Sequence, residues 1–157
     1  MSKRKVIMLT DSSLTYPKVM AEDAQAVLKR LEAYDAEVVY VQDQKDWDRS
    51  MFVEYASKVE KTGPEPFEVN PEFLKEAEDA EVIIANFAPV GSAIIRAGKK
   101  LKMIGVTRSG AENVNIEAAS EQGVKVAVAP GRLADPVSDY TVGLILAESR
   151  NIARMSI

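Results

Sequence analysis

The sequence predicts an α/β domain built on a five-stranded parallel sheet. Apolar runs of strand length, rich in Val and Ile and bounded by turn residues, recur at residues 5–10, 37–41, 82–86, 103–107 and 124–129. Their apolarity is continuous rather than alternating, which indicates strands that are buried on both faces, as in a parallel sheet. The length of 157 residues and the 46% apolar content suit one domain with such a core.

Helical patterns fill the segments between these runs. After Pro17, apolar residues at helical spacing predict a helix that continues to Leu31, and three prolines make residues 62–71 a surface loop. Further helices are expected at residues 46–61, 71–78, 92–100 and 116–122. With right-handed crossovers, this alternation predicts a flavodoxin-like three-layer sandwich with strand order 2-1-3-4-5.

A long C-terminal helix is expected from Val137 to Arg154. Asp135 is suited to cap this helix, and Pro136 is suited to its first position. Its apolar residues cover more than one face, so we expect it to be buried on several sides. Where no other part of the chain covers it, we expect two copies to pair through it in a homodimer.

Composition excludes several classes of function. The 20 basic and 24 acidic residues give a net charge of −4 and are interspersed, so no nucleic-acid partner is expected. The sequence contains neither cysteine nor histidine, and therefore neither a disulfide framework nor a structural zinc site is expected. No apolar stretch approaches the roughly 18 residues of a membrane span, and we expect a cytoplasmic location without a membrane partner.

The loops that follow the strands are the candidate binding sites, because ligands of open parallel sheets bind beyond the carboxyl ends of the strands. Residues 10–15, TDSSLT, are suited to cradle a phosphate, and equally to form turns and cap a helix. Asn86 ends the third strand where a phosphate-accepting receiver domain needs a carboxylate, which argues against that class.

A second candidate loop, residues 107–114 or TRSGAENV, follows the fourth strand. Gly110 permits close approach of a ligand, and Arg108 adds a cation; alternatively, Gly110 makes a tight turn and Asn113 caps the next helix. Arg132 follows the fifth strand. Two arginines at neighbouring strand ends favour an anionic ligand.

Three stretches carry a resemblance to a known family: DAEVIIANFAPV at residues 79–90, LKMIGVTRSGAENVNIEAASEQGVKV at 101–126, and APGRLADPVSDYTVGLILAESRNIARM at 129–155. Together they resemble the D-isomer-specific 2-hydroxyacid dehydrogenases, which include phosphoglycerate dehydrogenase. Residues 1–78 fit this family only at the level of fold. The resemblance implies the substrate-binding domain of an NAD-dependent oxidoreductase that acts on the CH–OH group of a D-2-hydroxy acid.

The resemblance also implies a set of site residues. The backbone amides of Ser109 and Gly110 are expected to contact the carboxylate of a small 2-hydroxy or 2-keto acid, with Asn113 shaping the same loop. Residues 87–90, which include Ala88, are expected on the opposite wall of the cleft. The residues expected at the mouth of the cleft and beside the nicotinamide are Arg132 and Val137, respectively.

The parts that catalysis needs are not found in the sequence. The family binds NAD through a Rossmann domain with a GxGxxG fingerprint and protonates the carbonyl oxygen with a histidine, and the 157 residues contain neither. We therefore expect residues 1–157 to be the substrate-binding domain alone, with no bound NAD and no turnover. Two other hypotheses stay open: a stand-alone flavodoxin-like module for a small anion or flavin phosphate, and a purely structural or assembly role.

Overall fold

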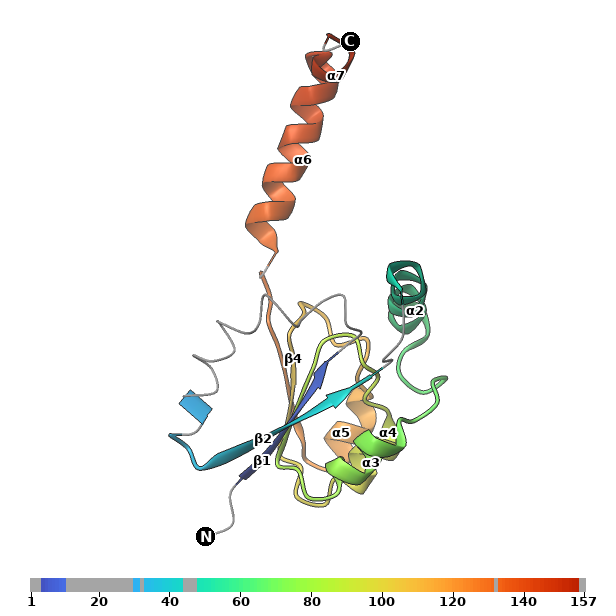
Figure 1. Ribbon diagram of the computed structural model, residues 1–157, viewed down its shortest axis with the longest axis vertical. Helices are drawn as coiled ribbons and strands as arrows, with labels where there is room; N and C mark the ends of the chain where they lie inside the picture. Colours follow the sequence, from blue (N-terminus) through green and yellow to red (C-terminus); the bar gives the residue numbers. More distant parts are fainter. Residues whose placement is uncertain (1–3, 11–29, 32, 44–47, 132, 156–157) are drawn as a thin grey trace.

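The computed structural model of the chain describes residues 4–10, 30–31, 33–43, 48–131 and 133–155. Five parallel strands form one sheet in the order β2-β1-β3-β4-β5, which confirms the predicted sheet and its order (Figure 1). The strands are β1 (Arg4–Thr10), β2 (Ala36–Gln42), β3 (Val82–Ala85), β4 (Met103–Val106) and β5 (Lys125–Val128). Because all five run in the same direction, their carboxyl ends meet at one edge of the sheet.

Three short helices form a layer on one face of the sheet (Figure 1). They are α3 (Pro71–Ala77), α4 (Ser92–Ala97) and α5 (Ile116–Glu121). The longer α2 (Arg49–Thr62) lies instead towards the carboxyl edge of the sheet. The helix predicted after Pro17 lies outside the described residues, except for residues 30 and 31, which are helical.

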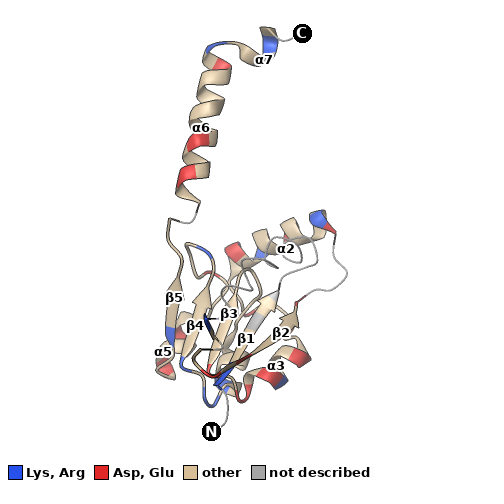
Figure 2. Ribbon diagram, turned by 60° about the vertical axis from the view of Figure 1, so that its left-hand side comes forward, with Lys and Arg blue, Asp and Glu red and all other residues tan. Residues whose placement is uncertain are grey.

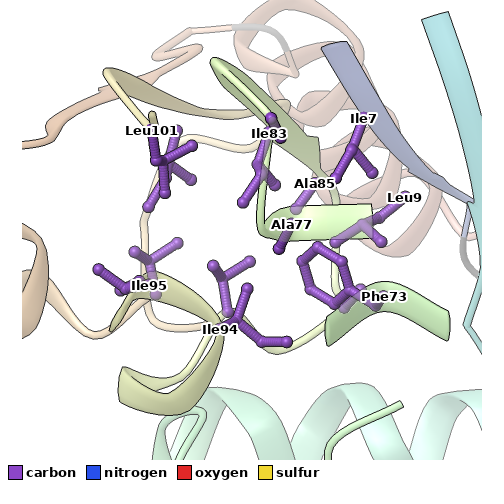
Figure 3. Close-up of a cluster of buried hydrophobic side chains, with 14 of the residues drawn as sticks. Ile7, Leu9, Phe73, Ala77, Ile83, Ala85, Ile94, Ile95 and Leu101 are labelled. Atoms are coloured by element: carbon purple, nitrogen blue, oxygen red, sulfur yellow. The ribbon is translucent and has the colours of Figure 1, made fainter. Parts of the chain in front are cut away.

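The core lies between the sheet and this helical layer (Figure 3). Ile7 and Ile83 from the strands are fully buried, and they face Phe73 of α3 and Ile94 of α4, which are at most 3% exposed. Burial of one large apolar side chain contributes about 1.5–3 kcal/mol to folding. The carboxyl edge of the sheet is therefore carried on a well-packed scaffold.

The C-terminal helix differs from the prediction in its bounds. The structure contains α6 (Ala134–Ser149), which begins three residues earlier than predicted with Leu133 at its N-cap. Asp135 lies inside the first turn, so the prediction that it caps the helix was wrong. The helix also ends earlier, because Asn151 adopts a left-handed backbone with φ of 54°, and a separate turn, α7 (Ile152–Met155), follows.

The prediction that this helix is buried on several sides was also wrong. The helix projects away from the sheet (Figure 1), and Leu144 and Ile145 are 53% and 61% exposed. Figure 2 shows few charged residues along it. An apolar pattern shows that a helix needs a partner, but among the described elements only the short α7, which follows it directly in the chain, packs against α6. None of the described helices combines the length and the apolarity needed to cross a bilayer.

Candidate substrate-binding site

The loops that follow β3 and β4 are joined by backbone hydrogen bonds at the carboxyl edge of the sheet. The amide of Val90 donates to the carbonyl of Asn113 at 2.8 Å, and the amide of Asn115 donates to the carbonyl of Val90 at 3.1 Å. These bonds form an isolated parallel bridge between Val90 and Val114. The two loops are therefore held as one unit, although they belong to different crossovers.

Asn113 connects the same two loops through its side chain. It is fully buried, and its Nδ2 donates to the carbonyl oxygen of Ala88 at 3.0 Å. It does not cap the next helix, as one alternative supposed, because Asn115 does so by accepting a hydrogen bond from the amide of Ala118 at 2.9 Å. The structure thus brings two of the predicted site residues, Ala88 and Asn113, into direct contact.

Ser109 and Gly110 lie immediately beyond the paired part of the sheet edge. The last backbone hydrogen bonds of the sheet lie just before them. The amide of Thr107 donates to the carbonyl of Ala85 at 3.0 Å, and the amide of Ala129 donates to the carbonyl of Arg108 at 2.8 Å. Ser109 is exposed and Gly110 is half-buried. Ser109 can therefore be approached from solvent, whereas the carboxylate of Glu112 occupies the space beside Gly110.

Arg108 is not a free cation at the mouth of a site. Its guanidinium lies over the ring of Phe87, 4.0 Å from the ring centroid, and pairs with Glu60 of α2. A second carboxylate, that of Glu112, lies 3.9 Å from Nη1 of Arg108. The side chain of Arg108 is only 14% exposed, so its charge is engaged within the protein and is not presented to solvent.

Helix α2 was expected from the sequence, but its position as a wall of this region was not. Besides Glu60, it contributes Phe52, whose ring packs edge-on against Phe87 with centroids 5.3 Å apart. The helix is also held at the end of β2, where the hydroxyl of Tyr55 donates to Oδ2 of Asp43 at 2.7 Å. Burial raises the pKa of the Asp43 carboxyl, and this hydrogen bond offsets only part of the effect.

Glu65, from the proline-rich loop, holds α4 and α5 to the same edge. Its carboxylate accepts hydrogen bonds from the amide and the hydroxyl of Ser92 at 2.8 and 2.9 Å, and from Nδ2 of Asn115. These bonds, that from Asn115 first, lower the pKa of Glu65. Glu65 thereby supplies the side-chain cap that Gly91, at the N-cap of α4, cannot provide. Sequence reasoning missed Glu65 because its partners are distant in the chain.

The remaining predicted residues are not brought to this loop by the described structure. Val137 lies in the first turn of α6, 57% exposed, on the helix that projects away from the sheet (Figure 1). Arg132 and the alternative phosphate loop at residues 11–15 lie outside the described residues. Within the described ranges, no cluster of three or more metal-ligating side chains occurs.

Comparison with known sequences shows a family similarity over most of the chain. The sequence model of "D-isomer specific 2-hydroxyacid dehydrogenase, catalytic domain" matches residues 18–156. The hydroxypyruvate reductase of Thermotoga maritima is 37% identical over 87 residues, covering 55% of this chain and 28% of that protein. The D-3-phosphoglycerate dehydrogenase of Methanocaldococcus jannaschii is 38% identical over 82 residues, covering 52% and 16%, respectively.

Solved structures share the fold. The NAD+-bound 3-phosphoglycerate dehydrogenase of Entamoeba histolytica superposes with a TM-score of 0.64 at 19% identity, covering 92% of this chain and 39% of that one. The NAD-dependent formate dehydrogenase of Staphylococcus aureus, in complex with NAD, superposes with a TM-score of 0.64 at 19% identity. The match covers 97% of this chain and 39% of that one. The chain thus spans well under half the length of these relatives.

Proposed function

Because the chain belongs to the D-isomer specific 2-hydroxyacid dehydrogenase family, we propose that it is the substrate-binding domain of an oxidoreductase acting on a D-2-hydroxy acid. The observation that carries this proposal is the match of the family's catalytic-domain model to residues 18–156, nearly the whole chain. The names of its relatives, hydroxypyruvate reductase and D-3-phosphoglycerate dehydrogenase, support a small 2-hydroxy or 2-keto acid as the substrate.

In this proposal the backbone amides of Ser109 and Gly110 bind the substrate carboxylate. The exposure of Ser109 and the absence of a side chain at Gly110, beside which the carboxylate of Glu112 already lies, support close approach of an anion. Asn113 and Ala88 hold the loop against its neighbour, so the amides are pre-oriented before the ligand arrives. Arg132 would add a positive charge at the mouth of the cleft.

We place NAD binding outside these 157 residues. None of the eight glycines has the GxGxxG spacing that cradles a dinucleotide pyrophosphate, so the residues present do not fit the whole cofactor. Val137 offers an exposed apolar contact for the nicotinamide. In the full-length enzyme NAD accepts or supplies the hydride, and the role of residues 1–157 is to hold and orient the acid.

We further propose that the chain forms a homodimer through α6. Val142, Ile145 and Leu146 share one side of this helix and are 54%, 61% and 49% exposed. Covering each of them would contribute about 1.5–3 kcal/mol, and the entropy of association offsets part of that gain. A two-fold pairing of identical helices is the simplest closed arrangement that covers them.

Titration of the 15N-labelled protein with glycolate tests the carboxylate site. Each charge-assisted hydrogen bond contributes about 1.5–3 kcal/mol, so we expect weak binding, with amide shifts concentrated at Ser109 and Gly110. Ethylene glycol, which keeps the hydroxyl and lacks the carboxylate, is the matched control and should leave these amides unchanged. Shifts concentrated at Ser12 and Ser13, or tight binding of flavin mononucleotide, would support the flavodoxin-like alternative instead.

A further inference from the structure

An internal carboxylate already lies against the loop that is proposed to bind the substrate carboxylate. A Cβ built on Gly110 would overlap the carboxylate of Glu112 and would lie 2.6 Å from its carboxylate carbon. The space that the missing side chain of Gly110 leaves open is therefore filled by Glu112, from only two residues further along the chain. An anionic group is accommodated at this backbone in the ligand-free domain.

The structure also contains a second place for this carboxylate. Nη1 of Arg108 is buried and has no hydrogen-bond partner among the described residues. It lies 3.9 Å from Oε2 of Glu112, too far for a hydrogen bond but within reach of a small side-chain movement. A buried charged donor without an acceptor is costly, so movement of Glu112 onto Nη1 would satisfy it.

We propose that Glu112 is a specificity-determining gate that occupies the substrate-carboxylate position in the ligand-free domain and moves to Nη1 of Arg108 when an acid binds. This inference rests on the proposed function of the Ser109–Gly110 amides. Two carboxylates cannot share the position beside Gly110, because like charges at such a separation repel strongly. A ligand must therefore displace Glu112, and the displaced carboxylate gains a hydrogen bond from Nη1 of Arg108, with which it already forms a longer ion pair.

The gate would favour ligands that carry a carboxylate over neutral ones of similar shape. A neutral diol or amide carries no charge that repels Glu112, and it leaves Glu112 in place. A ligand carboxylate takes the place of Glu112 beside Gly110 and releases Glu112 to Arg108. Selection at this loop then depends on the exchange of one carboxylate for another.

The test compares glycolate binding to wild type, Glu112→Gln and Glu117→Gln by amide-shift titration. Glu112→Gln removes the competing charge, and we expect it to bind glycolate about tenfold more tightly than wild type. Glu117, an exposed residue in the first turn of α5, is the matched control, because its replacement changes the net charge by the same amount. Glu117→Gln should bind like wild type.

A second variant tests the role of Arg108. Arg108→Lys removes Nη1, so it should weaken glycolate binding to the wild-type chain more than to the Glu112→Gln chain, which has no carboxylate to relocate. Circular dichroism checks that the Arg108→Lys protein stays folded. Equal weakening in both backgrounds would show that Glu112 does not move onto Arg108.

The outcomes separate the gate from the proposed function. Shifts at Ser109 and Gly110 with equal affinity in wild type and Glu112→Gln would overturn the gate and leave the substrate site standing. Tightening of equal size in Glu117→Gln would assign the effect to net charge and also overturn the gate. Absence of shifts at this loop in all variants would overturn both proposals.

Discussion

The side-chain amide of Asn113 donates a hydrogen bond to the backbone carbonyl of Ala88 at 3.0 Å, across 25 residues of sequence. This bond joins the loop after β4 to the loop after β3, and the backbone bonds between Val90 and Asn113 run beside it. Because Asn113 is fully buried, no solvent can replace the bond when it is lost. The geometry of the candidate substrate loop therefore depends on one amide side chain together with these backbone bonds.

Replacement of Asn113 should destabilise the domain. Asn113→Ala leaves the Ala88 carbonyl without this donor, and we expect the free energy of unfolding to fall by about 1–3 kcal/mol. Asn113→Asp should cost more, because it buries a carboxylate beside a carbonyl oxygen. Urea denaturation followed by circular dichroism measures both. The exposed Ser109→Ala is the control, expected within about 0.5 kcal/mol of wild type; Asn113→Ala at wild-type stability would contradict this role.

Loss of the Glu65 carboxylate should weaken the start of α4. Glu65→Gln replaces one accepting oxygen by a donor, and we expect a loss of about 1 kcal/mol at neutral pH, as for removal of a helix N-cap. The pKa of Glu65 is lowered in the folded state. Its contribution to the stability of the domain is therefore present above the unfolded pKa and is lost as the pH falls through the folded pKa. Thermal unfolding against pH should show the two proteins converging in acid, whereas Glu68→Gln, in the same loop, should follow wild type throughout.

Asp43 should have the opposite pH dependence. Burial raises its pKa, so the folded state holds this proton more tightly than the unfolded chain, and stability is lost as the pH rises from the unfolded towards the folded pKa. Asp43→Asn removes that penalty and keeps an oxygen that accepts from Tyr55. We expect Asp43→Asn to gain stability relative to wild type as the pH rises, as measured by denaturant unfolding at a series of pH values.

Tyr55→Phe provides the paired variant. Without the hydroxyl that donates to Asp43, the ionised carboxylate loses this hydrogen bond, and the benefit of Asp43→Asn should become larger in this background. A benefit of Asp43→Asn that does not change with pH would show that ionisation of Asp43 is not its source.

The chain should self-associate through α6. Light scattering after size exclusion at tens of micromolar is expected to give the mass of a dimer, and Leu146→Lys should convert it to a monomer by placing a charge in the apolar contact. Tyr140→Lys adds the same charge on the other side of the helix, at a side chain that is also exposed, and should leave the dimer intact. A wild-type monomer, or a dimer that survives Leu146→Lys, would contradict the proposed surface.

A polypeptide of these 157 residues should not oxidise NADH with glyoxylate, pyruvate or hydroxypyruvate. It contains no histidine to protonate the carbonyl oxygen and no GxGxxG spacing to hold the cofactor. The loss of NADH absorbance should therefore equal that of the buffer blank. Turnover that co-purifies with the protein, and that persists after a second chromatographic step, would refute this expectation.

Much of the scaffold was predictable because its signals are local in the chain. Continuous apolar runs marked all five strands to within one residue at each end, because the strands are apolar along most of their length. Charged residues such as Lys5, Glu37 and Lys125 lie only near the strand ends. Asn70 followed by Pro71 similarly marks the start of α3, where the Asn70 side chain accepts from two backbone amides. The resemblance to the dehydrogenase family was also confirmed, and the model of that family extends it to residue 18.

By itself, the sequence determined the parallel sheet, its strand order and the family, because apolar runs and motif spacing are patterns among residues that are close together in the chain. Only the tertiary structure decided how the site is held: Arg108 pairs with Glu60 at a separation of 48 residues, and Glu65 with Ser92 at 27. Pairs of this kind have no local signature, because the sequence around a carboxylate does not show which distant residue the fold brings next to it. The same reason explains why α6 was wrongly predicted to be buried within the chain. An apolar pattern indicates that a helix needs a partner, but it does not indicate which surface supplies that partner.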